Sequence, residues 1–262
     1  MTDSKRILNQ PAWLLHHRPF RDSSQLLDVL SRDHGRLTLV ARGSRSTKSR
    51  LKGILRPFMP VQYSWVIRSD LGTLTGAEVH GQPISLLGEA LLAGYYVNEL
   101  LLCLLHRHDP QPDIFAAYAQ VISGLAGRTD LAACLREFEM ALLRILGYAP
   151  ILDHDAQSLE PLREEAFYEY RVERGPIQSD RGEGPSTYSG SLLMAIGRQN
   201  FSDADVLLGA SRLLRDIIAF HLGGRELKSR KVLLELRHTA RIRDNAQNNH
   251  DNQNSRNNEN PL

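Results

Sequence analysis

Residues 61–67 read V-Q-Y-S-W-V-I, and this stretch decides the fold of the N-terminal part of the chain. Its apolar side chains stand at every second position, namely Val61, Tyr63, Trp65 and Ile67. Side chains at this spacing share one face of a β-strand. The stretch therefore predicts a half-buried strand whose aromatic side chains lie in a core.

Four further strands are predicted around this one. They cover residues 12–18, 26–30, 35–42 and 72–79, each a short apolar or alternating run. The sequence D-H-G at residues 33–35 predicts a tight turn between two of them. Five short strands within about 80 residues fit a small closed barrel, and the OB-fold is the commonest five-stranded barrel of this kind.

The apolar pattern changes to a helical period after Pro83. Helices are predicted over residues 84–107, 113–125, 130–146, 203–222 and 227–237. The expected N-caps are Asp113, Thr129 or Asp130, and Ser202 or Asp203. The intervening segment carries the strand-like F-Y-E-Y-R-V-E and two Gly-Pro turn sequences, which indicate a small hairpin insert.

These patterns predict an α+β protein, in which a five-stranded OB-fold barrel precedes a mostly α-helical domain with a small hairpin insert. The predicted segments are the barrel at 1–81, the helical domain at 82–150 and 191–240, the insert at 151–190, and a tail at 241–262. The tail holds eight Asn in its 22 residues and almost no apolar side chains. Such a segment cannot bury enough surface to become ordered.

Composition narrows the classes of protein to consider. The net charge is only +2, from 32 basic and 30 acidic residues, and 42% of the residues are apolar, enough for a sizeable core. The first residues lack the apolar run of a signal peptide. Polar residues interrupt the longest apolar stretch, at Glu89, Asn98 and Glu99, and would be costly in a membrane. We therefore expect a soluble cytoplasmic protein.

Positive charge is concentrated in one place despite this balance. Between residues 33 and 70 there are eight Arg or Lys and no Asp or Glu. Six of them form a basic loop, the segment 42–56: Arg42, Arg45, Lys48, Arg50, Lys52 and Arg56. Arg36, in the preceding strand, is a further candidate. Such a local excess predicts a polyanionic ligand, and the small and hydroxyl residues between the cations are expected to keep the loop mobile.

Nucleic acid is the favoured ligand, because OB-type barrels commonly bind it through their loops and the adjacent sheet face. An anionic membrane would suit the charge equally, but no amphipathic helix accompanies the loop. Candidates for stacking on bases are Trp13, Phe20, Phe58, Tyr63 and Trp65. Core packing is the better explanation for Tyr63 and Trp65, because both lie on the alternating apolar face.

Catalytic and metal-binding motifs find little support. No phosphate-binding glycine loop, H-E-x-x-H or G-x-S-x-G sequence occurs. The C-x-x-H-x-H at residues 103–108 lacks a fourth ligand of matching spacing, and His154 stands alone between two aspartates. Acids at 28, 33 and 70 are more typical of turns than of a nuclease. We therefore expect no catalytic residues, no metal and no cofactor.

Several motifs occur together and in order along the chain. They are R-P-F-R-D-S-S-Q-L-L-D-V-L (18–30), G-R-L-T-L-V-A-R-G-S-R (35–45), S-R-L-K-G-I-L-R-P-F (49–58), Y-Y-V-N-E-L-L (95–101), L-R-E-F-E-M-A-L-L-R-I-L-G-Y (135–148), F-S-D-A-D (201–205) and L-G-G-R-E-L-K-S-R (222–230). The ordered set spans about 220 residues. Through these motifs the sequence resembles the RecO family of bacterial recombination mediators.

The resemblance implies an OB-fold, a helical domain and a small insert. It also implies binding of single- and double-stranded DNA, annealing of complementary strands, and a location in the cytoplasm at the nucleoid. The implied partners are the acidic C-terminal tail of single-stranded-DNA-binding protein and RecR, which together help RecA load onto covered single strands in RecF-pathway gap repair.

Two positions matter for this comparison. Several relatives carry a cysteine zinc site in the insert, but residues 150–190 contain no Cys here and Asp155 stands near an expected ligand position. We therefore predict no zinc. Arg136 corresponds to an Arg that helps relatives hold the acidic tail, and an Arg beside an apolar groove suits a terminal carboxylate. The alternative is an i,i+3 partner of Glu139 on an exposed helix face.

A second basic patch is suggested near the C-terminus by Arg225, Lys228, Arg230 and Lys231, although a solvated helix start explains it equally well. Taken together, the sequence predicts a non-enzymatic DNA-binding and strand-annealing mediator. The alternative is an OB-fold RNA-binding or ribosome-associated factor, which would have the same electrostatics. A metal-dependent nuclease is a third class.

Overall fold

The computed structural model describes residues 5–67, 70–128, 130–182, 184–229 and 231–232. The chain divides into a compact unit that ends at Glu226 and a second unit that begins at Leu227. The predicted tail lies outside the described residues, as does most of the predicted helix at 227–237.

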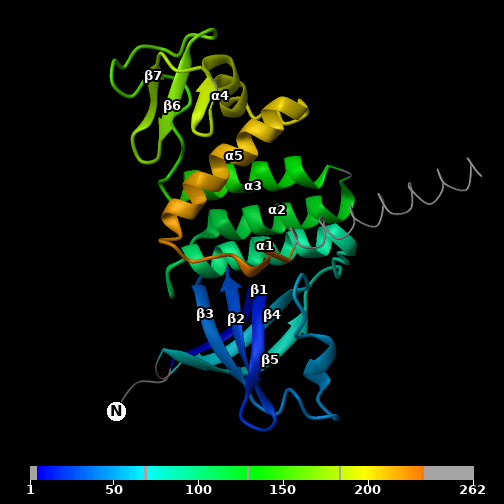
Figure 1. Ribbon diagram of the computed structural model, residues 1–262. Coiled ribbons are helices and arrows are strands. Elements are labelled where there is room, and N and C mark those ends of the chain that lie inside the picture. Colours follow the sequence, from blue (N-terminus) through cyan, green and yellow to red (C-terminus); the bar gives the residue numbers. More distant parts are fainter. Residues whose placement is uncertain (1–4, 68–69, 129, 183, 230, 233–262) are drawn as a thin grey trace, which may run out of the picture. The chain divides into compact units, whose positions relative to one another are not determined.

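Five strands form a closed barrel at the N-terminal end of the chain (Figure 1). They are β1 (Lys5–Phe20), β2 (Ser24–Ser31), β3 (Gly35–Ala41), β4 (Pro60–Ile67) and β5 (Leu71–Val79). The order around the barrel is β1-β2-β3-β5-β4, and the parallel pairing of β3 with β5 closes it. The predicted OB-fold is confirmed. β1 is longer than predicted because its first half pairs with β4 and its second half with β2.

Alternating side chains fill the barrel, as the pattern of residues 61–67 predicts. Tyr63 and Trp65 are completely buried on β4, and Leu14, Leu27 and Leu39 reach the same core from the first three strands. Burial of aromatic and branched side chains is the main stabilising term for such a small barrel. Core packing therefore accounts for Tyr63 and Trp65.

The outer face of β1 is also buried at Trp13 and Leu15, in the middle of the strand, because helices cover it there. The ring of Trp13 lies 5.3 Å from that of Tyr118 on α2. The Asn98 side chain on α1 donates to the carbonyl of Leu15 at 2.8 Å and accepts from the Tyr118 hydroxyl at 2.7 Å. All these groups are buried. This polar bridge fixes the barrel against the first two helices.

Five helices follow the barrel. They are α1 (Gly88–Leu104), α2 (Pro112–Gly127), α3 (Leu131–Ile145), α4 (Gly190–Gly197) and α5 (Ala204–His221). α1 lies between the barrel and α2, and α3 packs between α2 and α5 (Figure 1). The side chains of Asp130 and Asp203 cap α3 and α5 as predicted. The first helix is shorter than the predicted 84–107, since residues 84–87 are not helical and Leu105 is already extended.

The insert is a three-stranded sheet in the order β7-β6-β8, formed by β6 (Phe167–Arg171), β7 (Gly175–Ser179) and β8 (Thr187–Ser189). Asp155 organises it: one carboxylate oxygen accepts from the Ser158 amide at 2.7 Å and the other from the Gln178 amide at 2.6 Å. Burial raises the pKa of Asp155, but these and further hydrogen bonds outweigh burial and lower it. The carboxylate is thus engaged by the backbone of the insert.

We predict that Asn98→Ala lowers the free energy of unfolding by about 3 kcal/mol, because it leaves the Leu15 carbonyl and the Tyr118 hydroxyl buried without a partner. Tyr118→Phe removes one of the two hydrogen bonds and should cost about 1 kcal/mol. Urea unfolding followed by circular dichroism measures both. Tyr95→Phe, at a 43% exposed position on the same helix, is the control and should change stability by less than about 0.5 kcal/mol. Equal stabilities for Asn98→Ala and this control would contradict the assigned role.

Candidate nucleic-acid interface

The basic loop between β3 and β4 is folded into successive turns rather than extended as an arm. The Ser44 hydroxyl is buried and donates to the carbonyl of Ala41 at 2.9 Å. Ser49 caps a short 3₁₀ helix, η1 (Arg50–Gly53), by accepting from the Leu51 amide. The hydroxyl residues that the sequence suggested would keep the loop mobile therefore hold its backbone in turns.

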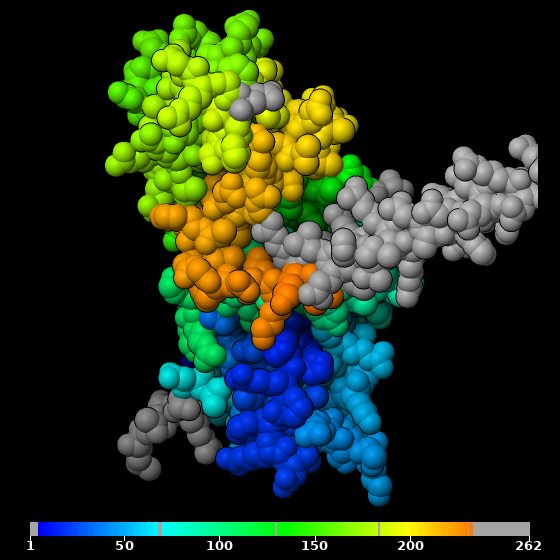
Figure 2. All heavy atoms as spheres, viewed as in Figure 1, coloured from blue at the N-terminus to red at the C-terminus, as the bar shows by residue number. Residues whose placement is uncertain are grey.

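Apolar residues between the cations attach the loop to the barrel. Leu55 is buried in the barrel core, and the partly buried Leu51 and Ile54 pack against it. The cations alternate with these anchors and turn outward. All six are exposed: Arg42, Arg45, Lys48, Arg50, Lys52 and Arg56. Figure 2 shows the same segment, in lighter blue, standing out from the barrel.

The described part of the protein does not neutralise the charge of the loop. Among the residues that the structure describes, none of the six cations forms a salt bridge with a carboxylate. Arg45 instead donates to two backbone carbonyls of the β1–β2 turn, those of Arg21 at 3.4 Å and Asp22 at 3.3 Å. The cations of the loop therefore keep their charge available to an external anion.

The contact between the basic loop and the β1–β2 turn places further cations beside the loop. The sequence analysis did not propose these residues as DNA-binding. Arg18 and Arg21 are exposed at the same end of the barrel. Arg21 lies over the ring of Phe20, with its guanidinium carbon 5.2 Å from the ring centre. The sequence R-P-F-R at residues 18–21 shows that two cations flank an aromatic residue. Its position beside the basic loop depends on strand pairing in the barrel and cannot be read from the sequence.

Arg36 lies apart from the basic loop. Its Nε donates to the carbonyl of Leu105 at 3.1 Å, just beyond the end of α1, and its own carbonyl accepts from the His108 amide. Burial, and then the neighbouring Arg107, lower the pKa of Arg36. β3 separates it from Arg42 by six residues, or about 20 Å of extended chain. The structure therefore places Arg36 where the barrel meets the helices.

Most of the predicted stacking candidates are unavailable. Trp13 and Phe58 are buried together with Tyr63 and Trp65. Phe20 is partly exposed. Of the five aromatic candidates, Phe20 alone presents ring surface near the basic loop.

The second basic patch is described only in part. Arg225 is in the first compact unit, where its Nε donates to the carbonyl of Leu222 at 3.0 Å. Lys228 and Lys231 belong to the second unit, and Arg230 lies outside the described residues. The second basic patch therefore stays a prediction.

Arg136 is largely buried between α3 and α5. One terminal nitrogen donates to the Ser211 hydroxyl at 2.7 Å and the other pairs with Glu139. Its side chain is 13% exposed and that of Glu139 is 1% exposed. The Tyr96 hydroxyl donates to the same carboxylate at 2.7 Å. Arg136 is thus an i,i+3 partner of Glu139, which was the alternative to a peptide-binding role. The pair lies on a buried helix face, whereas that alternative expected an exposed one.

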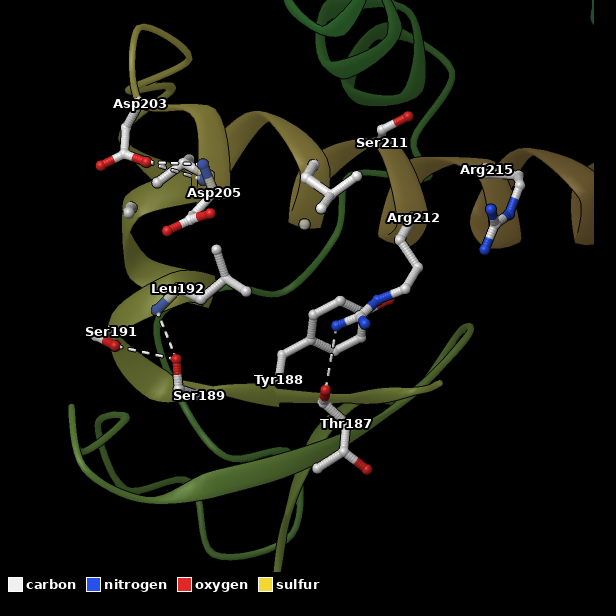
Figure 3. A pocket seen from close by; sticks show the side chains of 14 residues that line it. Thr187, Tyr188, Ser189, Ser191, Leu192, Asp203, Asp205, Ser211, Arg212 and Arg215 are labelled. Carbon is white, nitrogen blue, oxygen red and sulfur yellow. Dashed lines mark hydrogen bonds between the residues drawn. The ribbon is translucent and has the colours of Figure 1, made fainter. Parts of the chain in front are cut away.

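A groove of about 820 Å³ lies beside this pair, between β8, α4 and α5 (Figure 3). Ser211, the partner of Arg136, lines it together with Arg212 and Arg215. The guanidinium of Arg212 stacks 4.4 Å from the ring centre of Tyr188 and donates to the Thr187 carbonyl at 3.3 Å. The arginines that face the groove are therefore on α5, whereas Arg136 stands behind Ser211.

The described part of the chain offers neither a cluster of metal ligands nor a helix that could span a membrane. No group of three His, Cys, Asp or Glu side chains there is arranged to hold a metal ion. His154 pairs with Asp153, with 2.6 Å between Nδ1 and Oδ1. No described helix is both long and apolar enough to cross a bilayer.

Comparison with known proteins covers almost the whole chain. Two family models match, "Recombination protein O N terminal" over residues 5–83 and "Recombination protein O C terminal" over residues 88–231. The DNA repair protein RecO of Azoarcus sp. (strain BH72) is 43% identical over 240 residues, which are 90% of this chain and 99% of that protein. The protein of the same name from Dechloromonas aromatica (strain RCB) is 41% identical over 237 residues, 88% of this chain and 97% of that protein.

We predict that Arg136→Ala lowers the free energy of unfolding by about 3 kcal/mol, because it leaves the buried Glu139 carboxylate without its cation. Arg128→Ala is the matched control on an exposed ion pair with Glu137, and it should cost less than about 1 kcal/mol. Urea unfolding of both variants makes the comparison. Equal losses of stability in the two variants would show that the Arg136–Glu139 pair contributes no more to stability than an exposed ion pair.

Proposed function

The chain belongs to the RecO family, and from that membership and the basic loop we propose that it is a DNA repair and recombination protein that binds DNA and anneals complementary strands. It acts without catalytic chemistry of its own, as a mediator in RecF-pathway gap repair. The observation that carries this proposal is the set of six exposed cations, none paired with a carboxylate among the described residues.

The physical basis is neutralisation of phosphate. Each Lys or Arg that contacts a phosphate releases a bound counterion, so affinity falls with salt. Six such contacts to a single strand correspond to a slope of about −4 for the logarithm of affinity against the logarithm of salt concentration. A surface that neutralises two strands at once lowers their mutual repulsion, which favours annealing.

The helical domain is proposed to bind protein partners. The acidic C-terminal tail of single-stranded-DNA-binding protein would enter the groove between β8, α4 and α5, where Arg212 suits its carboxylates and the exposed Leu208 offers apolar surface. Arg215 lines the same groove in an ion pair with Asp216. Arg136 would support this site by holding Ser211. RecR is the second proposed partner, and RecA is assisted indirectly, at the nucleoid in the cytoplasm.

We predict that reversal of Arg42, Arg45, Lys48 and Arg50 to Glu lowers DNA affinity at least a hundredfold and abolishes annealing, because attraction to phosphate becomes repulsion. Circular dichroism should show an unchanged fold, since none of the four is buried. The control reverses four exposed arginines of the insert and α4: Arg171, Arg174, Arg181 and Arg198. Anisotropy of a labelled oligonucleotide measures binding. Annealing that survives in the loop variant, or is lost equally in the control, would contradict the assignment.

The peptide site is tested separately with a synthetic acidic peptide that ends in Phe. Arg212→Ala and Arg136→Ala should each weaken its binding about tenfold, the first by removing a charged hydrogen bond and the second by releasing Ser211. Arg128→Ala, at the C-cap of α2, is the control. Unchanged affinity in Arg136→Ala would remove Arg136 from the site, and unchanged affinity in Arg212→Ala would remove the groove.

The alternative is an OB-fold RNA-binding or ribosome-associated factor, and competition separates it from the proposal. Single-stranded DNA and structured RNA are compared as competitors at matched salt, and DNA should compete at least as well. A labelled oligonucleotide incubated with magnesium should stay intact. Cleavage would instead place the protein among nucleases.

A further inference from the structure

A partly exposed aromatic side chain, Phe20, and an exposed cation, Arg21, lie together at the tip of the β1–β2 hairpin. Phe20 pairs with Ser24 at the last position of the ladder, so the turn consists of residues 21–23. Arg21 adopts a left-handed conformation, with φ of 52°, which is uncommon for a residue other than glycine. That conformation accompanies a guanidinium placed 5.2 Å from the centre of the Phe20 ring.

The hairpin tip is joined to the basic loop. The Arg45 amide donates to the Ser23 carbonyl at 2.9 Å, and its guanidinium donates to the carbonyls of Arg21 and Asp22. A backbone that follows the cations of the loop would therefore pass beside the Phe20 ring. Asp22 is the acid of this turn, and its backbone carbonyl accepts from Arg45. The exposed cations Arg18, Arg21 and Arg45 outnumber its carboxylate, so the surface around Phe20 is net positive.

The Phe20 ring differs from the other aromatic rings of the barrel. Tyr63 and Trp65 are fully buried, and Trp13 is enclosed by α2. A partly exposed ring beside phosphate-binding cations is the arrangement by which proteins hold single strands, since every base has a face that can stack. In a duplex the base faces are covered by their neighbours in the helix, and such a ring gains nothing.

We propose that Phe20 stacks on an unpaired base, that Arg21 holds the adjoining phosphate, and that this pair gives the protein a preference for single-stranded over double-stranded DNA. The inference rests on the proposed function, because it requires the basic loop to bind DNA. It adds a contact that depends on bases rather than on charge, and therefore persists at high salt.

The experiment compares three DNA probes of equal length at the same salt concentration. They are an oligothymidine, the same backbone with abasic positions, and a duplex. Phe20→Ala should weaken binding of oligothymidine about tenfold, as expected for loss of one stacked base. Its binding of the abasic strand and of the duplex should stay within about twofold of the unchanged protein. Phe220→Ala, at a 51% exposed aromatic on α5, is the matched control and should bind all three probes normally.

Phe20→Trp should bind oligothymidine as well as the unchanged protein does, and its fluorescence should report stacking on a base. Its fluorescence should be quenched by oligothymidine but not by the abasic strand, against a background from Trp13 and Trp65, which are buried. Circular dichroism of each variant checks that the hairpin has folded.

The proposal is overturned if Phe20→Ala binds oligothymidine normally, or loses affinity equally for all three probes, which would be the behaviour of a ring that only packs against Arg21. These outcomes differ from failure of the proposed function. If the proposed function were wrong, the variant with Arg42, Arg45, Lys48 and Arg50 changed to Glu would still bind DNA, whatever the effect of Phe20→Ala.

Discussion

The side chain of Leu55 enters the barrel core, and Leu51 and Ile54 pack beside it, so that a loop of six cations is held against the protein by its apolar residues. A charged side chain cannot follow them inward, because burial without a partner is costly. The cations therefore turn to solvent together, and their mutual repulsion is offset by the burial of their neighbours. An external polyanion relieves that repulsion, which is why the loop is poised to bind one.

β1 connects this surface to the rest of the molecule. Its inner face contributes Leu14 to the barrel core, and its outer face contributes Trp13 to the contact with α2. It ends at Phe20, beside the basic loop. From Trp13 to Phe20 is about 23 Å along an extended strand. One regular element thus supports the core, the buried contact with the helices and the tip of the proposed DNA surface.

The sequence predicts those features that depend on local order. Period-two alternation finds the strands, and Asp130 and Asp203 cap helices where predicted. It misses α4, although Ser189 caps this helix by accepting from the Leu192 amide, because eight residues are too few to show a clear helical period. It cannot tell that Arg36 is held by the helical domain while Arg42 faces solvent, nor that Phe20 stays partly exposed while Trp13 is covered, because strand pairing and helix docking decide both.

Arginine has different roles here according to what surrounds it, and this limits any inference from charge alone. Arg136 is neutralised by Glu139 on a buried face, and Arg36 is held by a carbonyl at the helical end of the barrel. Arg42 has neither kind of partner among the described residues and is exposed. Three arginines that are equivalent in the sequence thus serve packing, attachment and, in the case of Arg42, the proposed binding of DNA. The distinction depends on whether the fold brings an acid within reach, so in a chain with nearly balanced charge the informative cations are those that the fold has left without one.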